Sequence, residues 1–175
     1  MSKVIKYIFL NLFTCLSVVG SAQIKSAIVG VDGLTCSACS FATEKSILKL
    51  EFVDSVRMEL EKNIAYVYFK KESKVSITEL AQKVVDAGFA VRSIFILAEL
   101  NQKKVSNDFC LTIGADVFQF VKISSESELN GLVTLKIVGD KFMSKKEFKN
   151  WRMYCSAKCN STATISSKIY YATLP

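Results

Sequence analysis

The sequence predicts an α+β protein, with an N-terminal unit of alternating strands and helices followed by a β-rich C-terminal unit. Between residues 24 and 97, the spacing of apolar residues alternates between strand and helix periods, in the order βαββαβ. From about residue 98, strand-type alternation prevails, with one short helical stretch. Half of the 175 residues are apolar, which suits a packed core and excludes intrinsic disorder.

The first 22 residues are expected to be separate from the fold. A short basic segment precedes an apolar run at 7–19, and small residues at 20–22 offer a cleavage site. The run is shorter than the roughly 20 helical residues that span a bilayer. We therefore expect a signal peptide at 1–22 and a secreted, in a bacterium periplasmic, mature chain without a membrane span. A retained anchor, or lipidation at Cys15, is the alternative.

The N-terminal unit, 23–97, is predicted to hold four strands and two helices. They are predicted, in order, as a strand at 24–31, a helix at 38–50, strands at 56–60 and 65–69, a helix ending at Ala87 and a strand at 90–97. Ser76 and Glu79 form a capping box for the second helix, and Gly88 suits its left-handed C-terminal cap. This order is that of a ferredoxin-like fold, in which two helices cover one face of an antiparallel sheet.

The C-terminal unit, 108–175, is predicted as a separate β-rich domain after a polar boundary at 98–107. Alternating residues predict strands at 109–113, 117–123, 133–137 and 165–174. Ser144 and Glu147 form a second capping box, which opens a short helix ending near residue 154. Four strands and one helix suggest a small closed or partly open barrel, for which an OB-like barrel is one candidate.

Composition excludes several classes of function. The chain has no histidine, and its one proline is Pro175. Without histidine there is no Ser-His-Asp or Cys-His catalysis, no Cys2His2 zinc finger and no c-type haem attachment. The formal charge is +7, with a basic cluster around the short helix at 144–154. Predicted export argues against nucleic-acid binding, so this cluster is read as a solvated face or a docking patch for an acidic partner.

Cys36 and Cys39 are the candidate metal ligands, spaced CxxC where a loop enters the first helix. Two thiols at this spacing can converge on one ion, and the helix N-terminus stabilises the thiolate over the thiol. Two soft thiolates without a hard ligand suit Cu(I), and also Hg(II). A tetrahedral zinc site would require two further ligands.

These residues resemble the heavy-metal-associated domain family. The segment GLTCSAC at 33–39 is similar to the family motif GMTCxxC, and DAGF at 86–89 is similar to the end of its second helix. The likeness spans residues 24–97, and a signal peptide with one such domain resembles periplasmic mercury-binding proteins and copper chaperones. The resemblance implies that Cys36 and Cys39 bind a thiophilic ion and pass it by ligand exchange to cysteines of a partner protein.

The resemblance also implies residues around the metal. Leu34 stands where the family usually has methionine, and we expect it to serve as a buried apolar tether. Thr35 and Phe89 are expected next to the metal ligands, although Phe89 suits plain core packing equally well. Phe52 stands where the family often has glycine, so the turn into the second strand is expected to differ.

The remaining cysteines allow more than one pairing. Cys155 and Cys159 are spaced CxxxC and are interpreted as a structural disulfide, or else as a second soft-metal site. Cys110 lies within a predicted strand and is interpreted as a small buried residue.

The sequence thus favours a metallochaperone-like carrier or scavenger of Cu(I), with Hg(II) as the alternative ion. We expect it not to be an enzyme and to hand its ion to a transporter or metalloprotein. A second hypothesis is an interaction or assembly protein whose C-terminal domain docks such a partner through its basic helix. A third is a thiol–disulfide oxidoreductase, which the CxxC pair permits. The lack of an internal proline for a cis-proline beside the cysteines argues against it.

Overall fold

A computed structural model describes residues 22–156, 159 and 167–175. Except for Ala22, the predicted signal peptide lies outside these residues. The elements are, in chain order, β1 (Gln23–Asp32), α2 (Ser37–Ile47), β2 (Val53–Glu59), β3 (Ile64–Phe69), α3 (Ile77–Asp86), β4 (Ala90–Val105), β5 (Cys110–Ile113), β6 (Asp116–Phe120), β7 (Ser127–Val138), α4 (Lys145–Trp151), the 3-10 turn η1 (Arg152–Tyr154) and β8 (Ile169–Thr173). None of the described helices is long and apolar enough to cross a membrane.

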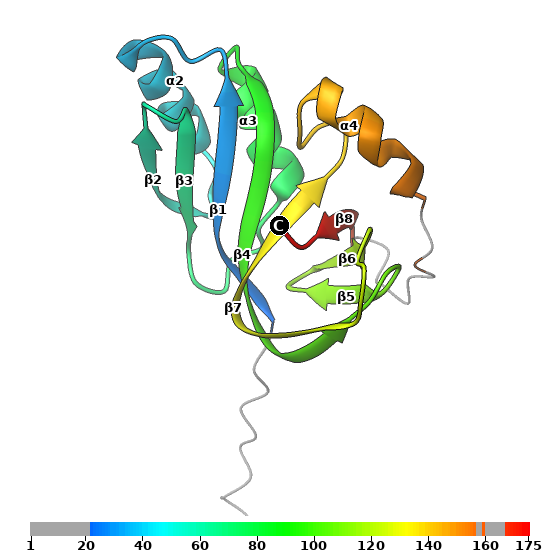
Figure 1. Cartoon of the computed structure of the whole chain (residues 1–175). Coiled ribbons are helices and arrows are strands. Elements are labelled where there is room, and N and C mark those ends of the chain that lie inside the picture. Colours follow the sequence, from blue (N-terminus) through cyan, green and yellow to red (C-terminus); the bar gives the residue numbers. More distant parts are fainter. Residues whose placement is uncertain (1–21, 157–158, 160–166) are drawn as a thin grey trace, which may run out of the picture.

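The N-terminal unit has the predicted βαββαβ order. Its strands form the sheet β2-β3-β1-β4 with antiparallel pairing throughout, and α2 and α3 pack together on one face (Figure 1). The predicted caps are confirmed. The Ser76 hydroxyl accepts a hydrogen bond from the Glu79 amide at 3.3 Å, and Gly88 has a φ of +90°. Local capping therefore sets both ends of α3.

The predicted boundary at 98–107 is wrong, because β4 continues without interruption to Val105. Ala98 and Leu100 remain buried and continue the strand alternation, whereas the polar side chains at 101–104 are exposed. These polar residues resemble a linker in sequence, yet Lys103, Lys104 and Val105 pair with β7. A stretch of strand whose side chains face solvent can therefore have the same polar composition as a flexible linker.

The C-terminal half, residues 98–175, extends this sheet instead of forming the predicted OB-like barrel. β7 pairs antiparallel with β4, and the strand order becomes β2-β3-β1-β4-β7-β8-β6-β5 (Figure 1). Within the described residues the sheet stays open, with β2 and β5 as its two edges. One buried cluster includes Val29 and Leu80 from the N-terminal unit together with Phe118 and Leu135 from the C-terminal half. The two parts therefore share a core.

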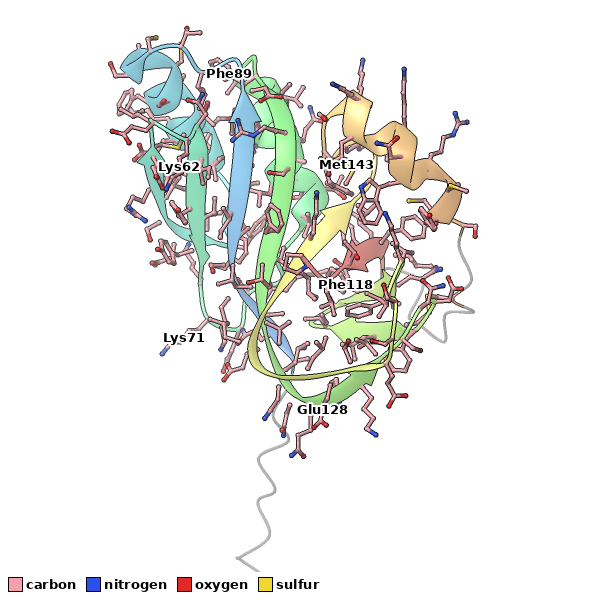
Figure 2. The ribbon with its side chains drawn as sticks, in the orientation of Figure 1. Lys62, Lys71, Phe89, Phe118, Glu128 and Met143 are labelled. Atoms are coloured by element: carbon pink, nitrogen blue, oxygen red, sulfur yellow. A yellow bond between two sulfur atoms is a disulfide. The ribbon has the colours of Figure 1, made fainter. Side chains whose placement is uncertain are left out.

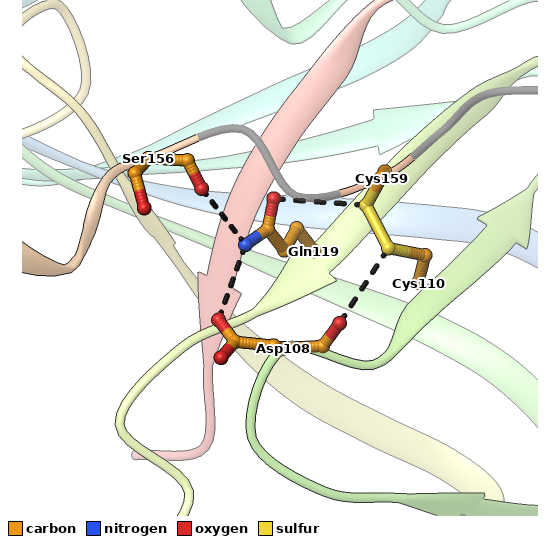
Figure 3. Close-up of a disulfide and its surroundings, with 5 residues drawn as sticks. All are labelled: Asp108, Cys110, Gln119, Ser156 and Cys159. Atoms are coloured by element: carbon orange, nitrogen blue, oxygen red, sulfur yellow. Dashed lines mark hydrogen bonds between the residues drawn. A yellow bond between two sulfur atoms is a disulfide. The ribbon is translucent and has the colours of Figure 1, made fainter.

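The expected disulfide between Cys155 and Cys159 is replaced by one between Cys110 and Cys159 (Figure 3). Cys110 lies on the β5–β6 hairpin directly opposite Gln119. The fully buried Gln119 amide donates hydrogen bonds to the Ser156 carbonyl at 3.1 Å and to the Asp108 carboxylate at 3.3 Å. These bonds hold the segment after η1 against the hairpin and bring Cys159 to Cys110. Cys110, expected to be buried, is exposed.

Tyr170 on β8 links the C-terminal half to α3. Its ring is buried between Phe118 and Phe142, with centroids 5.5 and 5.7 Å away. The phenol oxygen accepts a hydrogen bond from the Thr78 amide at 3.4 Å and lies 3.1 Å from the Thr78 hydroxyl. Burial raises the pKa of the Tyr170 phenol, so the group is protonated at neutral pH.

Tyr170→Phe should lower the free energy of unfolding by about 1 kcal/mol, because it removes this hydrogen bond and leaves the ring packing in place. Tyr171→Phe is the matched control, since its hydroxyl has no hydrogen-bond partner among the described residues. Urea unfolding of both variants measures the difference. Equal stability of the two variants would show that the Tyr170–Thr78 contact contributes nothing.

Candidate metal site

The candidate site is built on the loop that joins β1 to α2. Gly33 has a φ of +94°, a conformation that favours glycine, and turns the chain after the last residue of β1. Leu34 is buried, as expected for the apolar tether of the loop. Cys36 is the N-cap of α2, and its sulfur accepts a hydrogen bond from the Cys39 amide at 3.4 Å. The loop therefore places both cysteines at the first turn of the helix.

The structure brings the two predicted ligands together. Cys36 is exposed, Cys39 is half-buried, and their sulfur atoms lie 2.8 Å apart as free thiols. Two sulfur ligands at about 2.3 Å from one ion can be separated by no more than about 4.6 Å. Rotation of the exposed Cys36 side chain covers this range, so one ion can contact both sulfur atoms.

The surroundings of Cys39 favour its thiolate. Its pKa lies below the ordinary value, first because of the hydrogen bond with the Cys36 thiol and then because of a backbone hydrogen bond from Thr35. Thr35 thus contacts Cys39, and its expected role next to a bound metal stays a prediction. A thiolate is the form of cysteine that binds a metal. The free N–H groups at the start of α2 add to this stabilisation of negative charge on the sulfur.

Phe89, the other residue predicted beside the ligands, packs between the loop and the core. Its ring lies 3.5 Å from where a side chain on Gly33 would begin, and it also contacts the central core cluster. Figure 2 shows Phe89 at the end of the sheet where the β1–α2 loop lies. The ring therefore packs against the core and supports the loop at Gly33, while its expected place beside the metal ligands stays a prediction.

The sequence did not predict the residues that border the loop on the side away from Phe89. Leu60 and Asn63 border a hollow of about 310 Å³ next to Cys36. The turn that carries them is held in place by Arg92, whose guanidinium donates to the Lys62 carbonyl at 2.8 Å and contacts the Asn63 carbonyl at 3.4 Å. The turn itself is visible in the sequence, but its position beside Cys36 depends on the register of β1 with β3.

The second metal site, considered as the alternative to a disulfide at Cys155 and Cys159, is not assembled. Cys159 is bonded to Cys110, and the Cys155 thiol donates to the Trp151 carbonyl at 3.5 Å. Burial, with a smaller effect of the Asp140 carboxylate, raises the pKa of Cys155 and favours its neutral thiol. Among the residues that the structure describes, no three or more His, Cys, Asp or Glu side chains form a metal-binding cluster. Within the same described residues, Cys36 and Cys39 remain the candidate ligands, with two sulfur donors between them.

Comparison with known proteins finds similarity over the N-terminal unit. The sequence model of the heavy-metal-associated domain family matches residues 28–90. The mercuric transport protein periplasmic component of Shigella flexneri is 34% identical over 68 residues, which cover 39% of this chain and 74% of that protein. The copper chaperone CopZ of Staphylococcus haemolyticus is 31% identical over 65 residues, which cover 37% and 94% of the two chains.

A solved structure is also similar. The crystal structure of a copper-binding domain from HMA7, a P-type ATPase, has 31% sequence identity and a TM-score of 0.36, covering 39% of this chain and 90% of that one. The two sequence relatives are matched over most of their own length, and the matched family segment contains Cys36, Cys39 and Phe89. This chain therefore belongs to the heavy-metal-associated domain family.

Proposed function

We propose that this protein is a carrier of a thiophilic metal ion, with Cys36 and Cys39 as its two ligands. The observation that supports this most directly is the pair of free thiols at the start of α2, with Cys36 exposed and sulfur atoms 2.8 Å apart. Two soft ligands favour Cu(I), and also Hg(II), over harder ions. The relatives named as a copper chaperone and a mercuric transport component support the same class of cargo.

The exposure of the site suits transfer better than storage. An ion held by two thiolates on a surface loop keeps an open side, where thiolates of a partner can bind before the first pair dissociates. Leu34 would anchor the loop during this exchange, while Thr35 lies beside Cys39 and Phe89 supports the loop at Gly33. We propose a transporter or metalloprotein with its own cysteines as the recipient, and no catalytic step beyond ligand exchange.

We also propose that the protein acts outside the cytoplasm, in the periplasm of a bacterium. The Cys110–Cys159 disulfide supports this location, because disulfides persist in oxidising compartments and are rare in the cytosol. The periplasmic relatives support it independently. Cys36 and Cys39 would then require their ion, or a reducing partner, to remain unoxidised.

Titration of the metal-free protein with Cu(I), in competition with a coloured Cu(I) chelator, tests the proposal. We expect one Cu(I) per chain, displacement of Cu(I) by Hg(II), and no retention of Zn(II) on a gel-filtration column, because zinc lacks two of its four usual ligands. Free thiols are counted before loading to confirm that Cys36 and Cys39 are reduced. Zinc retained at one equivalent, or no bound Cu(I), would contradict the assignment.

A further inference from the structure

A groove of about 470 Å³ lies beside the metal-binding loop, between α3 and the segment that leads into α4. Its first wall belongs to the N-terminal unit and includes Ala81, Val85 and Phe89. Its second wall is the segment from Asp140 to Lys145 of the C-terminal half. This second wall lies outside the residues matched by the family model, 28–90. The groove therefore exists only because the C-terminal half is attached.

The second wall is held firmly in place. After β7, the chain turns at Gly139 and returns to the start of β4, where Met143 forms a β-bridge with Ser93. The Ser144 amide donates a hydrogen bond to the Arg92 carbonyl at 3.1 Å. Met143 is buried, and Figure 2 shows it on the same side of the sheet as α4. The groove is thus a preformed feature rather than a gap between loosely placed parts.

The groove reaches the start of the metal-binding loop and is partly lined by apolar side chains. Asp32 and Phe89 line it, and both adjoin Gly33 of the metal-binding loop. Val85 on α3 is 52% exposed, which is high for a valine and leaves an apolar contact surface within the groove. A protein segment lying in the groove would therefore contact apolar side chains and extend toward Gly33, three residues before Cys36.

The rim of the second wall is basic and unpaired. Five exposed basic residues lie on this wall or on the following helix, and none of them forms an ion pair with a described residue: Lys141, Lys145, Lys146, Lys149 and Arg152. The acidic residues nearby are mostly occupied, because Glu147 pairs with Lys136 and Asp32 with Arg92. Asp140 is the remaining acid on this wall. Five basic and two acidic residues give the stretch 139–154 a charge of +3.

We propose that this groove docks an acidic, amphipathic segment of the protein that receives the metal. The inference rests on the proposed carrier function and names the class of partner. Apolar residues of the segment would lie over Val85 and Phe89, while its carboxylates would face Lys141 and Lys145. Complementary charge accelerates such encounters and fixes their orientation. Docking there presents the partner's cysteines to Cys36 and Cys39.

The experiment measures transfer of Cu(I) from the loaded full chain to three synthetic acceptor peptides. Each peptide carries the same Cys-x-x-Cys segment, followed by a tail of leucines interspersed with glutamate, glutamine or lysine. At low salt we expect transfer to the glutamate peptide to be faster than to the glutamine peptide by about tenfold, at the lower end of measured electrostatic steering. This advantage should vanish near 1 M salt, where the screening length is about 3 Å.

Charge reversal locates the effect. Lys141→Glu with Lys145→Glu should abolish the preference for the glutamate peptide and leave Cu(I) affinity unchanged. The matched control is Lys70→Glu with Lys71→Glu, an equal change on exposed residues at the end of the sheet opposite Phe89 (Figure 2). The control should retain the preference. Val85→Asp, at an exposed position, should weaken transfer to both the glutamate and the glutamine peptide, because both use the apolar side chains of the groove.

Failure of docking and failure of the carrier function give different results. Equal transfer to all three peptides, or equal loss in both charge-reversal variants, would overturn the docking proposal while bound Cu(I) still supports the carrier function. If the protein binds no Cu(I), fluorescence anisotropy of the labelled glutamate peptide still tests the groove. If the protein bound phosphatidylglycerol vesicles through Lys141 and Lys145 in preference to this peptide, the choice of a protein partner would be overturned.

Discussion

Serine in place of either Cys36 or Cys39 should reduce Cu(I) affinity on the order of a hundred- to a thousandfold. Structural metal sites with four protein ligands bind with roughly 10–16 kcal/mol, so one ligand contributes roughly 3–4 kcal/mol. A two-ligand site has no other protein donor to replace the lost one. Chelator competition measures the affinity of each variant, and the double variant should retain no copper on a desalting column.

The fold is expected to survive these substitutions, which makes the loss of copper informative. Cys36 is the N-cap of α2, and serine is among the most favourable residues at that position. Cys39 is half-buried and contacts the core, so Cys39→Ala accompanies Cys39→Ser to separate a buried hydroxyl from the loss of the ligand. Cys155→Ser is the control and should bind copper normally. Full retention of copper by the double variant would show that the metal is bound by another thiol.

The N-terminal unit and its site could be predicted because their determinants are local. The cap at Ser76 and the left-handed Gly88 act within one helical turn, and each coincides with a sequence signal. Cys36 and Cys39 are three residues apart, so a loop that enters a helix is enough to bring them together. The surface around Cys36 and Cys39 could not be predicted in the same way, because Leu60 is placed beside Cys36 by the pairing of strands and not by the local sequence.

The C-terminal half could not be predicted to the same extent because its determinants are distant in sequence. The local pattern of residues does not indicate whether a strand pairs within the C-terminal half or adds to the edge of the N-terminal sheet. Leu129 and Lys103 meet only because β7 aligns with β4, and β6 pairs in parallel with β8 at residues far along the chain. The boundary at 98–107 rests on polar composition and the barrel on the number of predicted elements, and neither encodes the register of strand pairing.

The cysteine pairing shows the same limitation. Cys155 and Cys159 are neighbours in sequence, which favours pairing between them, whereas Cys110 and Cys159 are 49 positions apart. The buried amide of Gln119, bonded to Ser156 and Asp108, decides between these possibilities by fixing where the chain returns to the hairpin. The signal in the sequence is a glutamine within an otherwise apolar strand. Once buried, its amide needs hydrogen-bond partners, which points to a junction of this kind.

Removal of the Cys110–Cys159 disulfide should lower the free energy of unfolding by up to about 4 kcal/mol. A cross-link over 49 positions restricts a large loop of the unfolded chain, and chain-entropy reasoning assigns roughly this value to it. The double variant Cys110→Ala/Cys159→Ala avoids leaving a single thiol that could pair with Cys155. Guanidinium unfolding without reductant, compared with the wild type, measures the change.

Cys155→Ala is the matched control, because Cys155 is free and half-buried, and its loss should change stability by no more than about 1 kcal/mol. Copper binding should be unchanged in all these variants, since Cys36 and Cys39 lie on a different loop. A bond between Cys155 and Cys159 would give the opposite pattern: Cys110→Ala would be neutral, and Cys155→Ala would cost about 2 kcal/mol, the value for such a small loop. Peptide mapping of the alkylated, non-reduced protein distinguishes the two pairings directly, and finding Cys110 alkylated would refute the pairing in the structure.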